Sequence, residues 1–175
     1  MTTTVEPNFL TPEVLSYIGR ESADVPCPER LDRSTLRRYA QATHDTNPLY
    51  SDEAFARGSR YGELIAPPFY VARGFPPPLG QPPQDYNEPT TVDEDPTSTR
   101  VIIPGCPRLL NGGFQVEWFR PVYLGDQLYV RTRVANIEQK KGRAGPFVVV
   151  TTQRILRNQD SEVVAVATQT AIRMP

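Results

Sequence analysis

The sequence predicts an α+β fold in which short helices come first and a long antiparallel sheet follows. Helix caps and apolar residues at helical spacing occur between residues 11 and 56. Apolar and polar residues then alternate through residues 127–139, and short turn sequences separate this segment from two later ones of similar length. Strands joined by tight turns pair as an antiparallel meander, so we expect the helices to lie against one face of that sheet.

Proline and glycine positions define the elements before residue 30. Thr11 suits an N-cap and Pro12 suits the first position of a helix, so a short helix is expected over residues 11–18. Gly19 then ends it. Prolines at alternate positions exclude a helix from the Val-Pro-Cys-Pro segment at residues 25–28. We expect an extended edge strand there.

A second helix and a tight turn come next. Asp32 or Ser34 can cap this helix, whose apolar face holds Leu36, Tyr39, Ala40 and Thr43. The helix ends at the turn His44-Asp45-Thr46-Asn47-Pro48, because proline excludes the residue before it from the α region. Ser51 is expected to cap a further short helix through residues 52–56, where acidic residues favour the helix dipole.

Proline dominates the middle of the chain. Residues 61–72 form an apolar segment that predicts a short helix, beginning at Pro67 and Pro68 and broken at Gly74. Residues 75–100 are dense in proline and acidic residues and show no period, so they bury too little apolar surface to fold alone. This segment is interpreted as a loop, a lid or a strap that binds a partner, within one domain over residues 1–175.

The strands of the expected sheet occupy the last third of the chain. Alternation and turn residues place them at residues 114–119, 127–139, 147–156 and 163–172. A basic turn is expected over residues 140–146 and an Asn-Gln-Asp turn over residues 158–160.

Composition narrows the class of function. The net charge of -1 and the isoelectric point of about 5.9 give no basic surface for nucleic acid or an anionic membrane. There is no apolar run long enough to span a membrane and no signal-peptide pattern, so a cytoplasmic protein is expected. Two cysteines without ligand spacing and a single histidine, His44, predict no metal site.

The segment from His44 to Tyr50 gathers an imidazole, a carboxylate, an amide and a phenol within seven residues. These groups can act as acids, bases or hydrogen-bond donors in a site. Asp45 and Asn47 are also ordinary turn residues, whose side chains hydrogen-bond to nearby backbone. The residues by themselves leave both interpretations open.

Three motifs in one order resemble those of the MaoC-like hot-dog-fold hydratases and dehydratases. They are N-P-L-Y-S-D at residues 47–52, Y-G-E-L-I-A-P at residues 61–67, and F-R-P-V with G-D-Q-L at residues 119–122 and 125–128. The resemblance implies a hot-dog fold, in which a curved antiparallel sheet wraps a central helix and two units pair. It also implies reversible hydration of a trans-2-enoyl thioester without metal or cofactor.

The family's catalytic motif, D-x-N-P-x-H, is incomplete in this chain. Asp45 and Asn47 match its first two positions, but Tyr50 takes the place of the histidine base. Pro68 takes the place of a glycine whose N–H polarises the thioester carbonyl, and proline has no N–H. A phenol with a pKa near 10 is a poor base at neutral pH. Asp45, His44 and Tyr50 are therefore the candidate catalytic residues of an impaired site.

This pattern resembles the degenerate half of double hot-dog members and the non-catalytic subunits of heteromeric dehydratases. The leading hypothesis is thus a hydro-lyase subunit that supplies scaffold and acyl pocket to a hot-dog partner carrying D-x-N-P-x-H. Its ligand would be an acyl thioester of coenzyme A or acyl carrier protein, and the short helix at Pro67 indicates a wide tunnel for a bulky acyl group. Candidate substrate-binding residues are Asn47, Arg60, Tyr61, Gly62, Ile65, Ala66, Pro67 and Phe69.

Three other readings remain open at this point. A self-sufficient homodimeric hydratase would use Asp45 with His44 or Tyr50. A non-enzymatic hot dog would only bind acyl groups. A thioesterase on the same fold would need a carboxylate facing the central helix, with Glu63 or Asp52 as the candidate.

Overall fold

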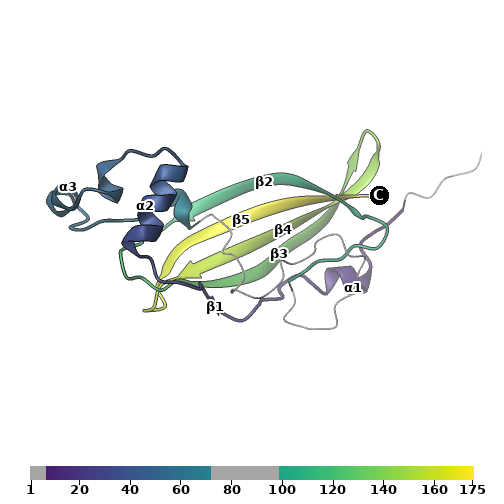
Figure 1. Cartoon of the computed structure of the whole chain (residues 1–175). Helices are drawn as coiled ribbons and strands as arrows, with labels where there is room; N and C mark the ends of the chain where they lie inside the picture. The colour runs from purple at the N-terminus through teal and green to yellow at the C-terminus, as the bar shows by residue number, and fades with distance from the viewer. Residues whose placement is uncertain (1–6, 72–98) are drawn as a thin grey trace, which may run out of the picture.

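The computed structural model describes residues 7–71 and 99–175 and is built on one five-stranded antiparallel sheet (Figure 1). The strand order is β1-β3-β4-β5-β2. The bounds are Val25–Pro26 for β1, Arg108–Trp118 for β2, Tyr129–Gly142 for β3, Gly145–Arg157 for β4 and Val163–Met174 for β5. The expected break at Gly74 and the proline-rich segment, up to residue 98, lie outside the described residues.

The antiparallel meander is confirmed, because β3, β4 and β5 are neighbours in both sequence and space. The edge strand expected over residues 25–28 is present but shorter, because β1 covers only Val25–Pro26 and pairs with β3 alone among the described strands. The expected basic turn over residues 140–146 is wrong in length. Pairing continues to Gly142 opposite Gly145, so the hairpin loop is only two residues long. Gly145 has a φ of +122°, a backbone conformation that favours glycine.

Strand β2 is longer than expected and begins at Arg108 rather than Phe114. It pairs with β5 along its whole length, with a bulge between Asn111 and Gly113. A Cβ on Gly112 would meet side-chain and backbone atoms of Thr170 at 3.1 Å, so glycine is needed where the two strands approach closely. Gly112 and Gly113 therefore form a bulge within β2, and the strand continues on both sides of them.

The three helices begin close to where their caps predict. Thr11 caps α1 (Pro12–Leu15) and Asp32 caps α2 (Arg33–Ala42), each through a side-chain oxygen that accepts a backbone N–H. The expected Ser51 cap is wrong, because Asp52 caps α3 (Glu53–Gly58). Ser51 instead closes the preceding 3-10 turn η1 (Pro48–Tyr50), since its N–H donates to the Pro48 carbonyl. A second 3-10 turn, η2 (Pro68–Tyr70), is what remains of the helix expected at the prolines.

Replacing Asp52 with alanine is expected to lower the free energy of unfolding by about 1 kcal/mol. Its Oδ1 accepts the N–H groups of Ala54 at 2.9 Å and Phe55 at 3.0 Å, and the variant leaves both without that acceptor. Urea denaturation measures the change, with Ser51→Ala as the control that should stay near the wild-type value. An equal loss in both variants would contradict the assignment of the cap.

The helices pack on one face of the sheet in two separate clusters. The first cluster joins α2, η1, α3 and η2 to one end of the sheet, where Leu156 and Ala165 are almost fully buried. The second joins α1 to Val134 and Val148 near the other end. Leu156 and Val148 are an even number of residues apart on β4, so both clusters lie on the same face. Figure 1 shows α2 and α3 at one end of the strands and α1 towards the other.

Candidate functional site

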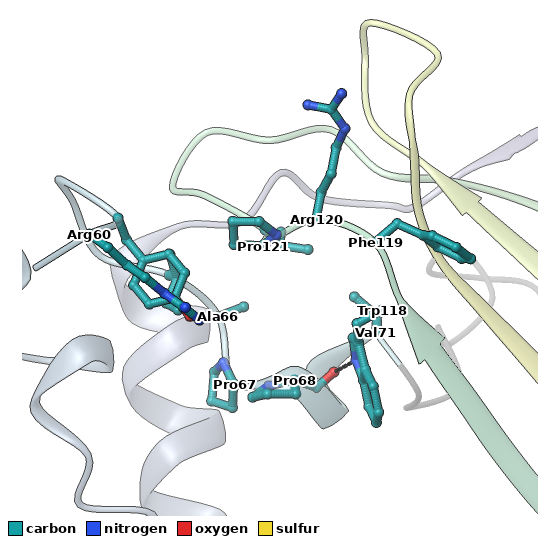
Figure 2. Close-up of a pocket in the computed structure, with 12 residues that line it drawn as sticks. Arg60, Ala66, Pro67, Pro68, Val71, Trp118, Phe119, Arg120 and Pro121 are labelled. Carbon is teal, nitrogen blue, oxygen red and sulfur yellow. Dashed lines mark hydrogen bonds between the residues drawn. The ribbon is translucent and has the colours of Figure 1, made fainter.

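A pocket of about 540 Å³ opens where η2 meets the end of β2 (Figure 2). One wall comes from the segment that leads into η2, and the other comes from the residues where β2 ends. The lining residues are Arg60, Tyr61, Ile65, Ala66, Pro67, Pro68, Val71, Trp118, Phe119, Arg120, Pro121 and Val122. Most of this surface is apolar, which suits a hydrocarbon ligand.

Hydrogen bonds between distant residues hold the two walls together. The N–H of Ala66 donates to the Val122 carbonyl at 2.8 Å, and Ile65 forms an isolated antiparallel bridge with Tyr123. The indole N–H of Trp118 donates to the Pro68 carbonyl at 2.8 Å. Residues about 50 positions apart in the sequence therefore shape one cavity.

The base of the pocket offers no backbone donor over four consecutive residues. The N–H of Ile65 donates to the Leu49 carbonyl at 3.2 Å, and the N–H of Ala66 is used by Val122. Pro67 and Pro68 have no N–H. No N–H of residues 65–68 is thus available to polarise a ligand carbonyl.

Two guanidinium groups supply charge at this pocket. Arg60 lies over the Tyr61 ring, with its Cζ 4.7 Å from the ring centroid, and donates to the Tyr61 hydroxyl. This hydrogen bond raises the pKa of Arg60 above its usual value, so the side chain stays cationic. Arg120 forms an ion pair with Glu162 at 2.9 Å, and Figure 2 shows its side chain directed away from the cavity.

The residues of the incomplete motif form a local turn and do not line this pocket. Asp45 is exposed, and its Oδ1 accepts the Asn47 N–H at 3.1 Å. The Oδ1 of Asn47 accepts the Leu49 N–H at 3.1 Å and caps η1. His44 is exposed with a positive φ of 52°. These contacts are those expected of residues that stiffen a turn.

Tyr50 lies in the core, with only 7% of its surface exposed. Burial, reinforced by the nearby Asp45 carboxylate, raises the pKa of Tyr50 above 10, although a hydrogen bond with Asn47 partly offsets the rise. A phenol with a raised pKa gives up its proton even less readily at neutral pH. The residue at the position of the family's base is therefore placed as a packing residue.

The structure brings together five of the eight candidate substrate-binding residues: Arg60, Tyr61, Ile65, Ala66 and Pro67. Asn47, Gly62 and Phe69 are not in the lining, although Phe69 packs against the lining residue Trp118. Residues 119–122 line the opposite wall and were not among the candidates. The F-R-P-V motif at these positions is the sequence signal that could have identified them.

The two carboxylates considered for thioesterase chemistry are also outside the lining. Asp52 is used as the cap of α3, and Glu63 is exposed. Within residues 7–71 and 99–175, no group of three histidine, cysteine, aspartate or glutamate side chains is arranged to hold a metal. None of the helices in these ranges is long and apolar enough to cross a membrane.

Comparison with known proteins gives consistent matches over most of the chain. A family model described as "FAS1-like, dehydratase domain region" matches residues 16–167. A UPF0336 protein of Saccharopolyspora erythraea is 31% identical over 130 residues, which are 74% of this chain and 72% of that protein. A probable enoyl-CoA hydratase alpha subunit of Thermomonospora curvata is 28% identical over 152 residues, which are 84% of this chain and 43% of that protein.

Solved structures share the same fold. A chain in the crystal structure of the ChsH1–ChsH2 complex from Mycobacterium tuberculosis superposes with a TM-score of 0.71 at 18% identity. The match covers 88% of each chain.

Proposed function

Because this chain belongs to the FAS1-like dehydratase family, we propose that it is the acyl-pocket subunit of a heteromeric enoyl-thioester hydratase or dehydratase. The MaoC-like resemblance and the hot-dog fold seen in the sequence are both confirmed. In the proposed assembly a second hot-dog subunit carries D-x-N-P-x-H and performs the addition or removal of water. This chain holds the acyl group in place.

The observation that supports the proposal is an apolar pocket without the catalytic groups that the family motif would supply. The cavity of about 540 Å³ has apolar walls, yet residues 65–68 offer it no N–H. Tyr50 is buried with a raised pKa, and Asp45 is exposed outside the lining. A site with these groups can bind and orient an acyl chain, whereas Tyr50 is a poor base and no N–H of residues 65–68 is available as an oxyanion donor.

A partner is supported by the uncovered side of β2. Its neighbour on one side is β5, and among the described residues no strand pairs with its other edge. Leu109 and Phe114, here called the β2 stripe, are 48% and 42% exposed. They lie opposite Arg173 and Gln169, so the stripe is on the same face as the core. An apolar stripe that extends a core into solvent is typical of a surface that another subunit covers.

The proposed ligand is an acyl thioester of coenzyme A or acyl carrier protein. The apolar walls suit the acyl chain, and the cationic Arg60 suits a phosphate group of the carrier. Water would add across the trans-2 double bond, with its oxygen at C3 and a proton at C2. In this scheme the partner supplies the base, while this chain excludes water from the acyl group and fixes its position.

Co-expression with a D-x-N-P-x-H protein encoded beside it tests the proposal. We expect the two chains to co-purify and to hydrate crotonyl-CoA, measured by loss of the enoyl-thioester absorbance, whereas this chain alone should show no activity. Replacing the motif histidine of the partner should abolish hydration, and Asp45→Asn in this chain should leave it within about threefold. Activity of the chain alone that Asp45→Asn removes would instead support a self-sufficient homodimer.

A further inference from the structure

Trp118 connects the two walls of the pocket through a side-chain hydrogen bond. Among the described lining residues, no other side chain is seen to donate from one wall to the other. It is the last residue of β2 and lies opposite Ala165 on β5, so the sheet fixes its backbone. Its indole N–H donates to the Pro68 carbonyl at 2.8 Å, drawn as a dashed line in Figure 2. Its ring also meets Phe69 edge to face, with centroids 5.3 Å apart and planes at 79°.

These contacts give the indole one fixed position. Rotation of the ring away from the pocket would break the bond to Pro68 and the contact with Phe69. An aromatic pair of this geometry contributes about 0.5–1.5 kcal/mol beyond the area it buries. The wall formed by Trp118 is therefore stiff, although 43% of the residue is exposed.

We propose that Trp118 is a specificity-determining residue that limits the width of the acyl group the pocket accepts. This inference rests on the proposed function, because it assumes that the pocket holds an acyl chain. A smaller side chain at this position would remove the wall and leave η2 without its bond to β2. The pocket should then accept wider acyl groups, while the binding of narrow acyl groups should change little.

Titration calorimetry with two thioesters that cannot be hydrated tests the proposal. The probes are butanoyl-CoA, which is narrow, and cyclohexanecarbonyl-CoA, which is wide, added to the chain in the assembly in which it purifies. We expect Trp118→Leu to shift the ratio of their dissociation constants about tenfold in favour of the wide probe. Trp118→Phe keeps a ring but has no N–H donor, so it should shift the ratio in the same direction by less.

Phe55→Leu is the matched control, because Phe55 is an aromatic residue that is 52% exposed and lies on α3 outside the pocket lining. It should leave the ratio unchanged. A Trp118→Leu ratio within twofold of the wild type, or an equal shift in the control, would overturn the proposal. Should Trp118→Leu fail to fold, the ratio of the two dissociation constants is measured for Trp118→Phe, whose side chain is bulkier than leucine.

A second measurement uses the fact that Trp118 is the only tryptophan in the chain. A bound acyl group should displace water from the indole and move its emission to shorter wavelength, in this chain prepared with a tryptophan-free partner. Binding heat without an emission change would place the ligand elsewhere and contradict the proposal. A width effect in a chain that forms no heteromeric complex would overturn the proposed function and leave this inference standing.

Discussion

Replacing Tyr50 with alanine is expected to lower the free energy of unfolding by about 3–5 kcal/mol. Tyr50 is 7% exposed and packs in the cluster that joins η1 to α2, α3 and the sheet, so truncation leaves a cavity between several elements. Urea denaturation of the purified chain measures the change. A loss below about 1 kcal/mol would contradict the assignment of Tyr50 as a packing residue.

Tyr50→Phe is the matched control, because it keeps the ring and removes only the hydroxyl. It should cost about 0.5–1.5 kcal/mol at neutral pH and leave hydration by the complex unchanged. The raised pKa of Tyr50 also sets the behaviour in alkali. Above pH 10 the unfolded chain releases the phenol proton while the native chain keeps it, so wild-type stability falls relative to Tyr50→Phe as the pH rises. A constant difference between the two proteins from pH 9 to pH 11 would contradict the raised pKa.

Placing aspartate at both Leu109 and Phe114 is expected to prevent assembly with the partner. Both residues belong to the β2 stripe and are about half exposed, so burying two carboxylates there would be costly without paired charges. Loss of an interface hot spot costs about 2 kcal/mol or more, which is about thirtyfold in Kd for each site. The measurement is co-purification followed by titration of the separately purified chains.

Val25→Asp is the control for this experiment. Val25 is an apolar residue that is 55% exposed on β1, at the opposite edge of the sheet. It should leave assembly intact, and the β2 variant alone should keep its stability within about 1 kcal/mol, because its changes are on the surface. Assembly that is unaffected by the β2 substitutions, or equally weakened by Val25→Asp, would place the partner on another surface.

The local parts of the fold were predictable from the sequence because their signals lie within a few residues. Thr11 and Asp32 cap the helices that their positions indicate, and the alternation after residue 127 marks the strands of the meander. The cap of α3 was predicted wrongly because two neighbouring residues can both serve as a cap. Serine and aspartate are both favourable N-caps. Ser51 closes η1 through its N–H, and α3 therefore begins one residue later, with Asp52 as its cap.

Two glycine-containing stretches misled the prediction of strand length. The basic segment at residues 140–146 contains two glycines and was expected to be a turn, yet β3 and β4 pair through most of it. Gly112 and Gly113 similarly precede the strand that was expected, and the structure uses them in a bulge. Cross-strand pairing outweighs local turn preference at these positions, and pairing partners are not visible in a single segment.

The sequence by itself determined the α+β class, the antiparallel order of the last three strands, the family, and the replacement of a histidine and a glycine by Tyr50 and Pro68. Only the tertiary structure decided that the N–H groups of Ile65 and Ala66 are used by Leu49 and Val122. It also placed Trp118 against Pro68, 50 residues away, to form the second wall of the pocket. The physical reason is that helix caps and alternation arise from neighbouring residues, whereas a pocket depends on contacts between distant segments that packing brings together.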